Sequence, residues 1–390
     1  IFVRIPKVGT MSITIRKVET PADLKRIIEF PYTLYADDPN WVAPLVSIQR
    51  DKFIKTKNPG WEYMVGDYFL AFRGDRLVGT IAAFINHRHN SFHDEQVGWF
   101  GAFEVYNDPE AAQALLDTAA NWVKAAGYPM IRGPQTFSTH EETGLLVDNF
   151  SRPVLLYPYN PPYYAGFIEA AGYQPCMDTY CFSMTQAQVK EVGLEDRLQR
   201  VTKAIMKRGK ISVRQINPAK LKEDFQLFKD IYNVAWEKNW GFVPMTEREL
   251  DALVEALGQF FDPDLAFFAY VADEPAGFIL AVPDFNQVLQ KAVPNPKTPE
   301  AITLLKALYY WKINPIIDCV RIPLLGVKRE FRNKGVDTVL YHHVLQAALN
   351  DNYQNSDAGW ILSTNEPMVS IARNFGSDVY KTFRYFEKAF

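Results

Sequence analysis

The chain has 390 residues, 48% of them hydrophobic and 22% charged, which is typical of a folded protein and excludes a disordered one. The chain is longer than one hydrophobic core usually accommodates, which predicts two domains of roughly 150 to 200 residues. The net charge of −3 and the pI of about 6.1 argue against a dedicated nucleic-acid binder. Three irregularly spaced cysteines and the lack of an apolar run near the ~18 residues of a membrane span favour a cytoplasmic protein without membrane contact.

An internal repeat organises the chain. FLAFRGDRLVGTIAAF (69–84) and FFAYVADEPAGFILAV (267–282) align without a gap, and six of the sixteen positions are identical. Each stretch shows an apolar strand, a polar turn and a second apolar strand, which predicts a β-hairpin. We expect residues 1–10, which precede the strand-like MSITIRKV, to be an upstream extension outside the fold.

The segments around the hairpins repeat in the same order. A strand and a helix precede each hairpin (ITIRKVET with PADLKRIIEFPYTLY, and ISVRQIN with PAKLKEDFQLFKDIYNVAW). A strand and an amphipathic helix follow (VGWFGAFEV with DPEAAQALLDTAANWVKAAG, and CVRIPLLGV with VDTVLYHHVLQAAL). Then come another strand, a helix stopped by glycine, and strand pattern to the end. The sequence therefore predicts a duplicated β-α-β-β-β-α-β-α-β order.

Two segments fall outside the repeat. GLEDRLQRVTKAIMKRG (193–209) is expected to be a helix with one apolar stripe and one basic face. The basic face is a nucleic-acid contact or, as the favoured reading, the solvated side of a connecting helix. Residues 285–314 form an insertion in the second copy, and its helix AITLLKALYYW is expected to cover a cleft or a domain interface.

A basic, glycine-containing loop precedes the helix expected at 336–348. In GVKREFRNKGVDTVLY (326–341), the charges before Gly335 sum to about +3, which suits a diphosphate at a helix N-terminus. Gly335 lets the backbone approach a ligand closely. Asp337 opposes this, since a carboxylate repels a diphosphate unless it points away. The alternative is a solvated basic turn. The charged residues before Gly335 are Lys328, Arg329, Glu330, Arg332 and Lys334.

This order of elements resembles the GNAT superfamily of acyl-CoA-dependent N-acyltransferases, present here as a tandem pair over nearly all of 11–390. The GNAT motif Arg/Gln-x-x-Gly-x-Gly/Ala is matched by RNKGVD (332–337), except that Asp337 stands at the last position. VGWFGAFE, GPQTFSTHEETGLLVDNF, YNPPYY and YNVAWEKNWGFVP are similar to segments of an uncharacterised bacterial tandem-GNAT family. Fem-type aminoacyl transferases and N-myristoyltransferase also use two GNAT-like halves.

The resemblance implies an α/β (α+β) fold of two GNAT-like domains, 11–190 and 191–390. Each would hold a mixed, mostly antiparallel twisted sheet flanked by helices. It also implies acetyl-CoA or another acyl-CoA as cofactor. The acidic loop FEVYNDPEAAQ would repel a diphosphate, so one cofactor site is expected, in the second domain, and the first domain would shape the acceptor side. The predicted cofactor-binding residues are Gly326, Val327, Lys328, Arg332, Asn333, Lys334, Gly335, Val336, Asp337 and Asn365.

Acyl transfer to an amine requires a neutral amine, a stabilised oxyanion and a thiolate that can leave. A backbone N–H near Gly326 or Val327 would stabilise the oxyanion. A carboxylate acting through water would deprotonate the amine. Glu237, in the segment that walls the acceptor site of GNAT folds, and Glu104, at the end of a strand, are the candidate bases. The alternative for Glu237 is a surface carboxylate.

The general acid is less well defined. GNAT enzymes often place a tyrosine four residues before the glycine of the last helix, and Ala372 occupies that position here. Tyr380 is the predicted substitute, with a half-buried strand residue as the alternative.

The acceptor side is expected at two aromatic and polar segments. One is VAWEKNWGF, whose aromatic residues alternatively belong to the core or a lid. The other is the long irregular link that contains RGPQTFSTHEETG and YPYNPPYY. Long ordered loops are often functional, so this link is expected to line an acceptor pocket. The predicted substrate residues are Trp236, Trp240, Arg132, Gln135 and His140.

Other chemistries receive little support from the sequence. His87, His89 and His93 could suggest a metal, but the run is typical of an exposed loop, and no metal is predicted. No G-x-S-x-G elbow, phosphate-binding P-loop or dinucleotide motif is present.

The leading hypothesis is a cytoplasmic N-acyltransferase, most simply an acetyltransferase. An amine on a small molecule or peptide would attack the thioester directly. The alternatives are Fem-like aminoacyl transfer from charged tRNA, and a catalytically degenerate pair that binds CoA or a metabolite or acts as a scaffold. No nucleic-acid or membrane partner is expected, and the protein would be a monomer or a homodimer.

Overall fold

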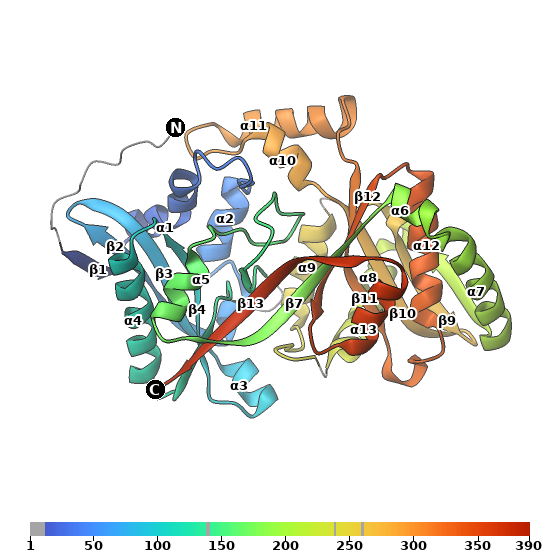
Figure 1. Cartoon of the computed structure of the whole chain (residues 1–390), viewed down its shortest axis with the longest axis horizontal. Coiled ribbons are helices and arrows are strands. Elements are labelled where there is room, and N and C mark those ends of the chain that lie inside the picture. The colour runs from blue at the N-terminus through green and yellow to red at the C-terminus, as the bar shows by residue number, and fades with distance from the viewer. Residues whose placement is uncertain (1–11, 138–140, 238, 259–260) are drawn as a thin grey trace.

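The computed structural model describes residues 12–137, 141–237, 239–258 and 261–390 (Figure 1). The strands of the first half are β1 (Ile13–Lys17), β2 (Met64–Arg73), β3 (Arg76–Asn86), β4 (Gly98–Val105), β5 (Met130–Gly133), β6 (Leu145–Leu146) and β7 (Gln174–Thr185). Its helices are α1 (Pro21–Leu34), α2 (Val46–Phe53), η1 (Pro59–Glu62), α3 (His87–His93), α4 (Pro109–Ala125) and α5 (Tyr164–Ala170). The connecting helices are α6 (Gln186–Glu191) and α7 (Leu194–Gly209).

The second half repeats this order with a longer insertion. Its strands are β8 (Ile211–Gln215), β9 (Ala266–Val271), β10 (Glu274–Pro283), β11 (Cys319–Val327), β12 (Asn355–Leu362) and β13 (Asp378–Ala389). Its helices are η2 (Pro218–Lys220), α8 (Leu221–Trp236), α9 (Glu247–Gly258), η3 (Pro263–Leu265), α10 (Asn286–Ala292), α11 (Glu300–Leu308), the π-helical turn η4 (Tyr309–Ile313), η5 (Arg329–Phe331), α12 (Val336–Asn350) and α13 (Glu366–Asn374). The predicted duplicated order is thus present.

The strands form one continuous 13-stranded sheet in the order β1-β2-β3-β4-β5-β13-β7-β12-β11-β10-β9-β8, with β6 paired to β13. Within it β4–β5 and β11–β12 are parallel, one pair in each half, and the other pairs are antiparallel. The predicted fold class, a mixed and mostly antiparallel sheet flanked by helices, is confirmed.

The two halves exchange their last strands. The C-terminal strand β13 pairs with β5 of the first half, and β7 of the first half pairs with β12 of the second. The two exchanged strands also pair with each other along most of their length and cross the middle of the molecule (Figure 1). The C-terminus therefore lies against the first half, where the Phe390 N–H bonds to Pro129 O.

Helices cover both faces of the sheet in each half. α4 and α5 pack on one face of the first half, and α1 and α2 pack on the other. α12 and α8 hold the corresponding positions in the second half. The apolar face of α4 is fully buried, as its 3.6-residue period predicts, at Ala112, Leu115, Leu116, Ala119 and Val123.

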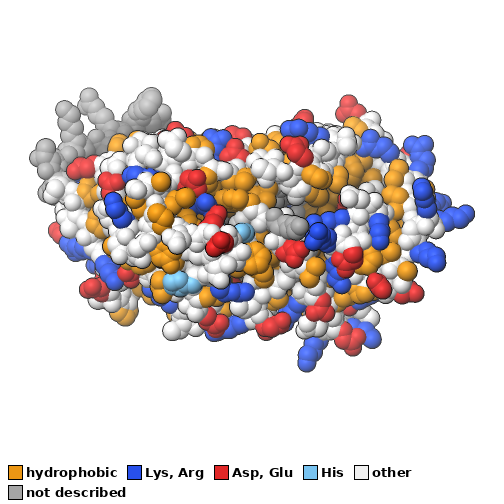
Figure 2. All heavy atoms as spheres, turned by 90° about the horizontal axis from the view of Figure 1, so that it is seen from below, with side chains coloured by type: hydrophobic (Ala, Val, Ile, Leu, Met, Phe, Trp, Pro, Cys, Tyr) orange, Lys and Arg blue, Asp and Glu red, His pale blue; other side chains and the backbone are white. Residues whose placement is uncertain are grey.

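The connecting helix α7 follows its predicted stripe only in part. Leu194 and Leu198 are buried, whereas Val201 is exposed. Lys and Arg side chains gather at the end of the molecule that holds α7 (Figure 2). Within the described part of the chain, no helix is long and apolar enough to cross a membrane.

Candidate active site

The parallel strands β11 and β12 pair only over their first halves. The register runs from Cys319–Asn355 to Ile322–Ala358, yet β11 continues to Val327 and β12 to Leu362. Beyond this point the two strands part. Gly326 and Val327, the residues predicted to stabilise the oxyanion, lie on β11 beyond this point.

A buried carboxylate lies where the strands part. Asp357 accepts hydrogen bonds from the hydroxyl of Tyr157 at 2.8 Å and from that of Tyr380 at 2.6 Å. Tyr157 comes from the long link of the first half, and Tyr380 from the exchanged strand β13. The predicted acid Tyr380 is therefore brought to a carboxylate that the sequence analysis did not single out.

Arg321 stands opposite Asp357 in the register and is also buried. Its Nε lies 3.7 Å from the carboxylate, and its guanidinium lies 3.8 Å from the centroid of the Tyr157 ring. Burial raises the pKa of Asp357 to about 6, and the nearby Arg321 charge opposes that rise. A carboxylate with a pKa near 6 is ionised at neutral pH and can still accept a proton there.

Gly326 lies under an aromatic ring. A Cβ built on this glycine would come within 2.9 Å of the Trp236 ring, so a larger residue would displace it. Trp236 also packs against Tyr232 and Phe278, with ring centroids 4.7 and 5.6 Å away. A predicted substrate residue and a predicted cofactor residue thus form one wall beside the parting strands.

The first half has a different group at the same place. Val105 pairs with Gly79, and Val327 pairs with Gly277, the equivalent glycine of the repeat. Glu104 therefore corresponds to Gly326. Its carboxylate accepts hydrogen bonds from the Tyr35 hydroxyl at 2.5 Å and the Tyr164 hydroxyl at 2.9 Å.

Burial raises the pKa of Glu104 to about 8, and the two tyrosine hydrogen bonds act in the opposite direction. The Tyr164 hydroxyl also accepts the Val105 N–H at 2.7 Å. Tyr35 ends α1 and Tyr164 begins α5, so both helices fix this cluster. The predicted base Glu104 is a protonated, closely held group at neutral pH.

The predicted diphosphate loop is partly engaged by the protein itself. Gly335 has a φ of +81° at the start of α12, and a Cβ there would lie 2.7 Å from Ile205 of α7. The Asp337 carboxylate accepts the backbone N–H of Thr338 at 2.8 Å. Asp337 therefore turns onto the helix N-terminus and takes one N–H group that a diphosphate would use.

The basic side chains of the loop divide into two groups. Arg332 donates to the carbonyl oxygens of Ala235 at 2.6 Å and Val327 at 3.3 Å, so it ties the loop to α8. Lys334 is exposed, with its ammonium 4.9 Å from the Phe331 ring centroid. The loop therefore retains exposed positive charge that fits phosphate groups. Asn333 lies beside it with a φ of +61°.

The remaining residues predicted to bind the cofactor lie at the ends of this loop or at the start of α13. The backbone N–H of Lys328 donates to Ala276 O at 2.8 Å, which fixes the end of β11. Val336 is buried at the first turn of α12. Asn365 begins α13, where its carbonyl oxygen accepts the N–H of Met368. None of these contacts tests cofactor binding, so the cofactor residues stay predictions.

Two predicted substrate residues from different halves meet. Arg132 lies 5.3 Å from the Trp240 ring centroid and forms ion pairs with Glu95 at 2.9 Å and Glu387 at 3.0 Å. Trp240 also packs edge-on to Tyr385, with ring centroids 4.8 Å apart. These contacts join the loop after α8 to the first half.

The other candidates lie elsewhere. Gln135 is buried, and its carbonyl oxygen touches the position where Gly101 lacks a side chain. Glu237 is exposed at the end of α8. His140 falls outside the described residues, and Glu237 keeps its role only as a prediction.

The histidine run forms a short helix, α3, and its contacts differ from those of an exposed loop. His89 is buried and lies 3.0 Å from Glu95, while His93 Nε2 lies 2.8 Å from Phe242 O. Burial lowers the pKa of His89 to about 4. Over the described ranges, no three His, Cys, Asp or Glu side chains gather closely enough to hold a metal ion.

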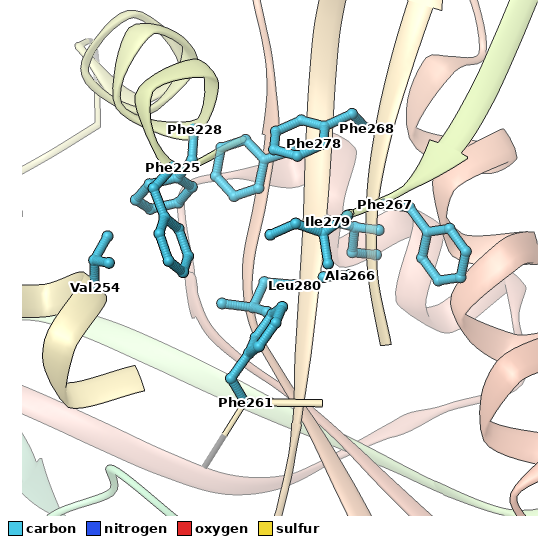
Figure 3. A pocket seen from close by; sticks show the side chains of 11 residues that line it. Phe225, Phe228, Val254, Phe261, Ala266, Phe267, Phe268, Phe278, Ile279 and Leu280 are labelled. Carbon is cyan, nitrogen blue, oxygen red and sulfur yellow. The ribbon is translucent and has the colours of Figure 1, made fainter. Parts of the chain in front are cut away.

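An apolar cavity of about 40 Å³ lies between α8 and strands β9 and β10 (Figure 3). Every lining side chain is apolar. Next to it is a groove of about 280 Å³, which Trp311 and Lys312 of the insertion also line. Phe261 borders both spaces. The rings around the smaller cavity are Phe225, Phe228, Phe261, Phe267, Phe268 and Phe278.

The Asp357 cluster had a signal in the sequence. Arg321 and Asp357 are single charges inside otherwise uncharged strand segments, CVRIPLLGV and NSDAGWIL. A buried charge requires a partner, so two opposite charges in consecutive strands joined by one helix could have been paired. The contacts of Tyr157 and Tyr380 depend on the strand exchange and had no such signal.

Comparisons with known proteins identify relatives along the whole chain. Protein YghO of Escherichia coli is 30% identical over 372 residues, 94% of this chain and 93% of that protein. Bacterial ceramide synthase of Caulobacter vibrioides is 32% identical over 383 residues, 95% of this chain and 96% of that protein. The chain belongs to the family that contains these two proteins. No family model matches it.

Solved structures agree on the fold. A tandem GNAT protein from the clavulanic acid biosynthesis pathway has a TM-score of 0.52 at 11% identity, over 97% of this chain and 98% of that one. The GNAT-type glucosamine N-acetyltransferase region of a fungal multi-domain β-N-acetylglucosaminidase has a TM-score of 0.55 at 14% identity, over 98% of this chain and 38% of that one. The predicted tandem GNAT architecture is confirmed.

Proposed function

We propose that the protein is an N-acyltransferase that moves a long acyl chain from acyl-CoA to the amine of a long-chain amino alcohol. The product would be an amide of the ceramide class. The observation that carries this proposal is the 32% identity, over almost the whole of both chains, to bacterial ceramide synthase. The amine was left unknown by the sequence and is here assigned to a class. The acetyl group expected from the sequence is replaced by a long acyl group.

The side chains at the parting of β11 and β12 support this reaction. In direct attack the amine nitrogen forms the amide bond while the carbon–sulfur bond breaks, so one proton leaves the nitrogen and one reaches the thiolate. Ionised Asp357 would take the first proton, directly or through water. Tyr380, hydrogen-bonded to Asp357 at 2.6 Å, would give a proton to the thiolate and regain one from Asp357.

The chain's own residues account for the remaining requirements. The exposed positive charge of the loop at 328–334 would hold the phosphates of CoA. The Trp236 ring packs against Gly326 and would limit access of water to the parting strands. The phenylalanine-lined cavity offers an apolar environment to the end of a hydrocarbon chain, and the neighbouring groove combines apolar walls with Asp262 and Lys312 (Figure 3).

The test is an assay with purified protein, palmitoyl-CoA and sphinganine, a long-chain amino alcohol. We expect thiol release and an amide product detected by mass spectrometry, both requiring the two substrates together. Acetyl-CoA with the same amine, and palmitoyl-CoA with a short polar amine, are the matched comparisons. Faster turnover with acetyl-CoA, or with the short polar amine, than with palmitoyl-CoA and sphinganine would refute the long-chain assignment.

A non-catalytic role is the second candidate. It is favoured by the contacts of the diphosphate loop, where Asp337 bonds to the helix N-terminus and Ile205 packs over Gly335. Binding of CoA without thiol release, for every acyl group and amine tested, would support this role instead.

A further inference from the structure

The insertion of the second half presents an unusual helix face. In α11, the side chains that face the protein are small, with Thr303 and Ala307 buried. The larger apolar side chains of α11 face outward, whereas Tyr310 and Trp311 of η4 are half-buried against the core. Leu305 and Ile313 are 68% and 71% exposed. The outward-facing group, here named the α11 surface, consists of Ile302, Leu304, Leu305, Leu308, Tyr309 and Ile313.

This arrangement is the reverse of an ordinary surface helix, which turns its large apolar side chains to the core. The α11 surface holds six of the fifteen exposed large hydrophobic side chains among the described residues, within twelve consecutive positions. Such a concentration on a protein surface marks a contact site. α11 lies at the margin of the molecule, beside α10 (Figure 1).

The same segment is basic in an otherwise acidic protein. Residues 286–317 contain four lysines and one glutamate, a local charge of +3, while the whole chain carries −3. The glutamate, Glu300, accepts the backbone N–H of Ser47 at 2.8 Å and so faces the protein. The lysines are all exposed: Lys291, Lys297, Lys306 and Lys312.

Aromatic residues complete the pattern. The Lys312 ammonium lies 4.0 Å from the Trp311 ring centroid, and Tyr309 is exposed beside it. Trp, Tyr and Lys are the residues that favour the boundary between lipid head groups and acyl chains. α11 and η4 together span residues 300–313, too few to cross a bilayer, so the segment would lie along its surface.

We propose that the α11 surface docks the protein on a lipid bilayer that contains anionic lipids. The apolar side chains would enter the head-group boundary, and the four lysines would contact lipid phosphates. The choice of a bilayer over a protein partner rests on this charge and, in part, on the proposed function, because both proposed substrates are membrane-soluble. The proposal departs from the expectation of no membrane contact.

The docked face leads toward the apolar interior. Trp311 and Lys312 line the 280 Å³ groove, and Phe261 separates that groove from the phenylalanine-lined cavity. A hydrocarbon chain leaving the bilayer at η4 would therefore cross a groove of mixed polarity and then meet the apolar walls of the cavity.

The first test is flotation of the full chain with vesicles of phosphatidylcholine, with and without added phosphatidylglycerol. We expect binding to the anionic vesicles and weaker binding to phosphatidylcholine alone. The double variant Leu305→Glu/Ile313→Glu should lower the vesicle affinity at least about tenfold, because two inserted side chains become charges. Lys306→Gln/Lys312→Gln should abolish much of the preference for anionic lipid.

Val201→Glu on α7 is the matched control. Like Leu305 and Ile313, Val201 is an exposed aliphatic residue on a basic helix. It is 43% exposed but lies outside the α11 surface. This variant should float like the wild type. An equal loss in Val201→Glu, or no binding of the wild type to anionic vesicles, would overturn the proposal. So would a wild-type dimer that becomes monomeric in Leu305→Glu/Ile313→Glu, because the surface would then be a dimer interface.

A second measurement separates this proposal from the proposed function. Flotation does not depend on turnover, so vesicle binding without amide formation would sustain docking and refute the N-acyltransferase assignment. With an active protein, Leu305→Glu/Ile313→Glu should lose activity on a vesicle-bound amine and keep it on a short-chain amine dissolved in water. Equal loss on both amines would refute docking as the cause.

Discussion

The two halves carry different side chains at one equivalent position. Glu104 in the first half and Gly326 in the second both precede the valine that pairs with the repeated glycine, Gly79 or Gly277. The first half fills the space with a carboxylate and two tyrosine hydroxyls. The second half fills it with the Trp236 ring.

The adjoining loops differ in charge in the same direction. In the first half, Arg73 pairs with Asp108 at 2.9 Å and with Glu110 at 2.8 Å, which leaves an acidic, closed helix start. In the second half, the loop before α12 is basic and its Lys334 is exposed. The duplicated fold thus keeps its strand register while the loops before α4 and α12 differ in the sign of their charge.

The strand exchange makes the copies dependent on each other. Asp357 belongs to the second half, yet its two hydroxyl partners come from the link at 147–163 and from β13, which lies between the halves. The Glu104 and Asp357 clusters therefore belong to one continuous sheet and not to two separable domains.

The sharpest test of the comparison is to remove each carboxylate. Asp357→Asn should lower kcat by roughly 10²- to 10⁴-fold, because the amide cannot accept the amine proton. Glu104→Gln should retain activity within about threefold, since Glu104 is protonated and its amide replacement keeps an acceptor. Steady-state thiol release measures both.

Circular dichroism of both variants controls for misfolding. Tyr380→Phe gives a third point, with an expected loss of about 10- to 100-fold if its hydroxyl supplies a proton. A large loss in Glu104→Gln with none in Asp357→Asn would place the chemistry in the first half.

The pH dependence of activity gives the next largest effect. Asp357 must be ionised to act as a base, so kcat/KM should fall about tenfold per pH unit as the pH drops below its pKa of about 6. A pH series on wild type measures this limb. If the residual activity of Asp357→Asn falls at acidic pH in the same way, another group is responsible for this pH dependence.

Binding of CoA tests the loop before α12. Asp337→Ala frees the Thr338 N–H and removes a negative charge, so it should tighten binding of CoA by roughly tenfold. Lys334→Glu should weaken binding by a similar factor. Calorimetric titration measures both, with the exposed Lys25→Glu on α1 as the charge-matched control. Unchanged affinity for CoA in both loop variants would show that the diphosphate of CoA does not bind at this loop.

The smallest effect concerns stability. The pKa of Glu104 is about 8 in the folded protein, above its ordinary value of 4.5. Between these values the unfolded chain has released the proton and the folded protein still binds it, so rising pH favours unfolding. From about pH 5 to about pH 8, the Tm of wild type should fall relative to that of Glu104→Gln. Exposed Glu191→Gln should show no such difference.

Local patterns of the sequence determined the elements and their duplication. The six identities between the hairpins fixed the register of the repeat, and the 3.6-residue period of α4 fixed its buried face. The opposite charges of the two loops before α4 and α12 are also a property of the sequence alone. These features depend on neighbouring residues, so short-range pattern is sufficient to predict them.

The tertiary structure alone decided which residues meet. Tyr157, Asp357 and Tyr380 lie far apart in the chain and converge because β7 and β13 exchange places between the halves. The outward turn of Leu305 and Ile313 was equally hidden, since an apolar helix reads the same whether it packs inward or outward. Long-range pairing and the choice of buried face are set by packing between elements, which no local pattern records.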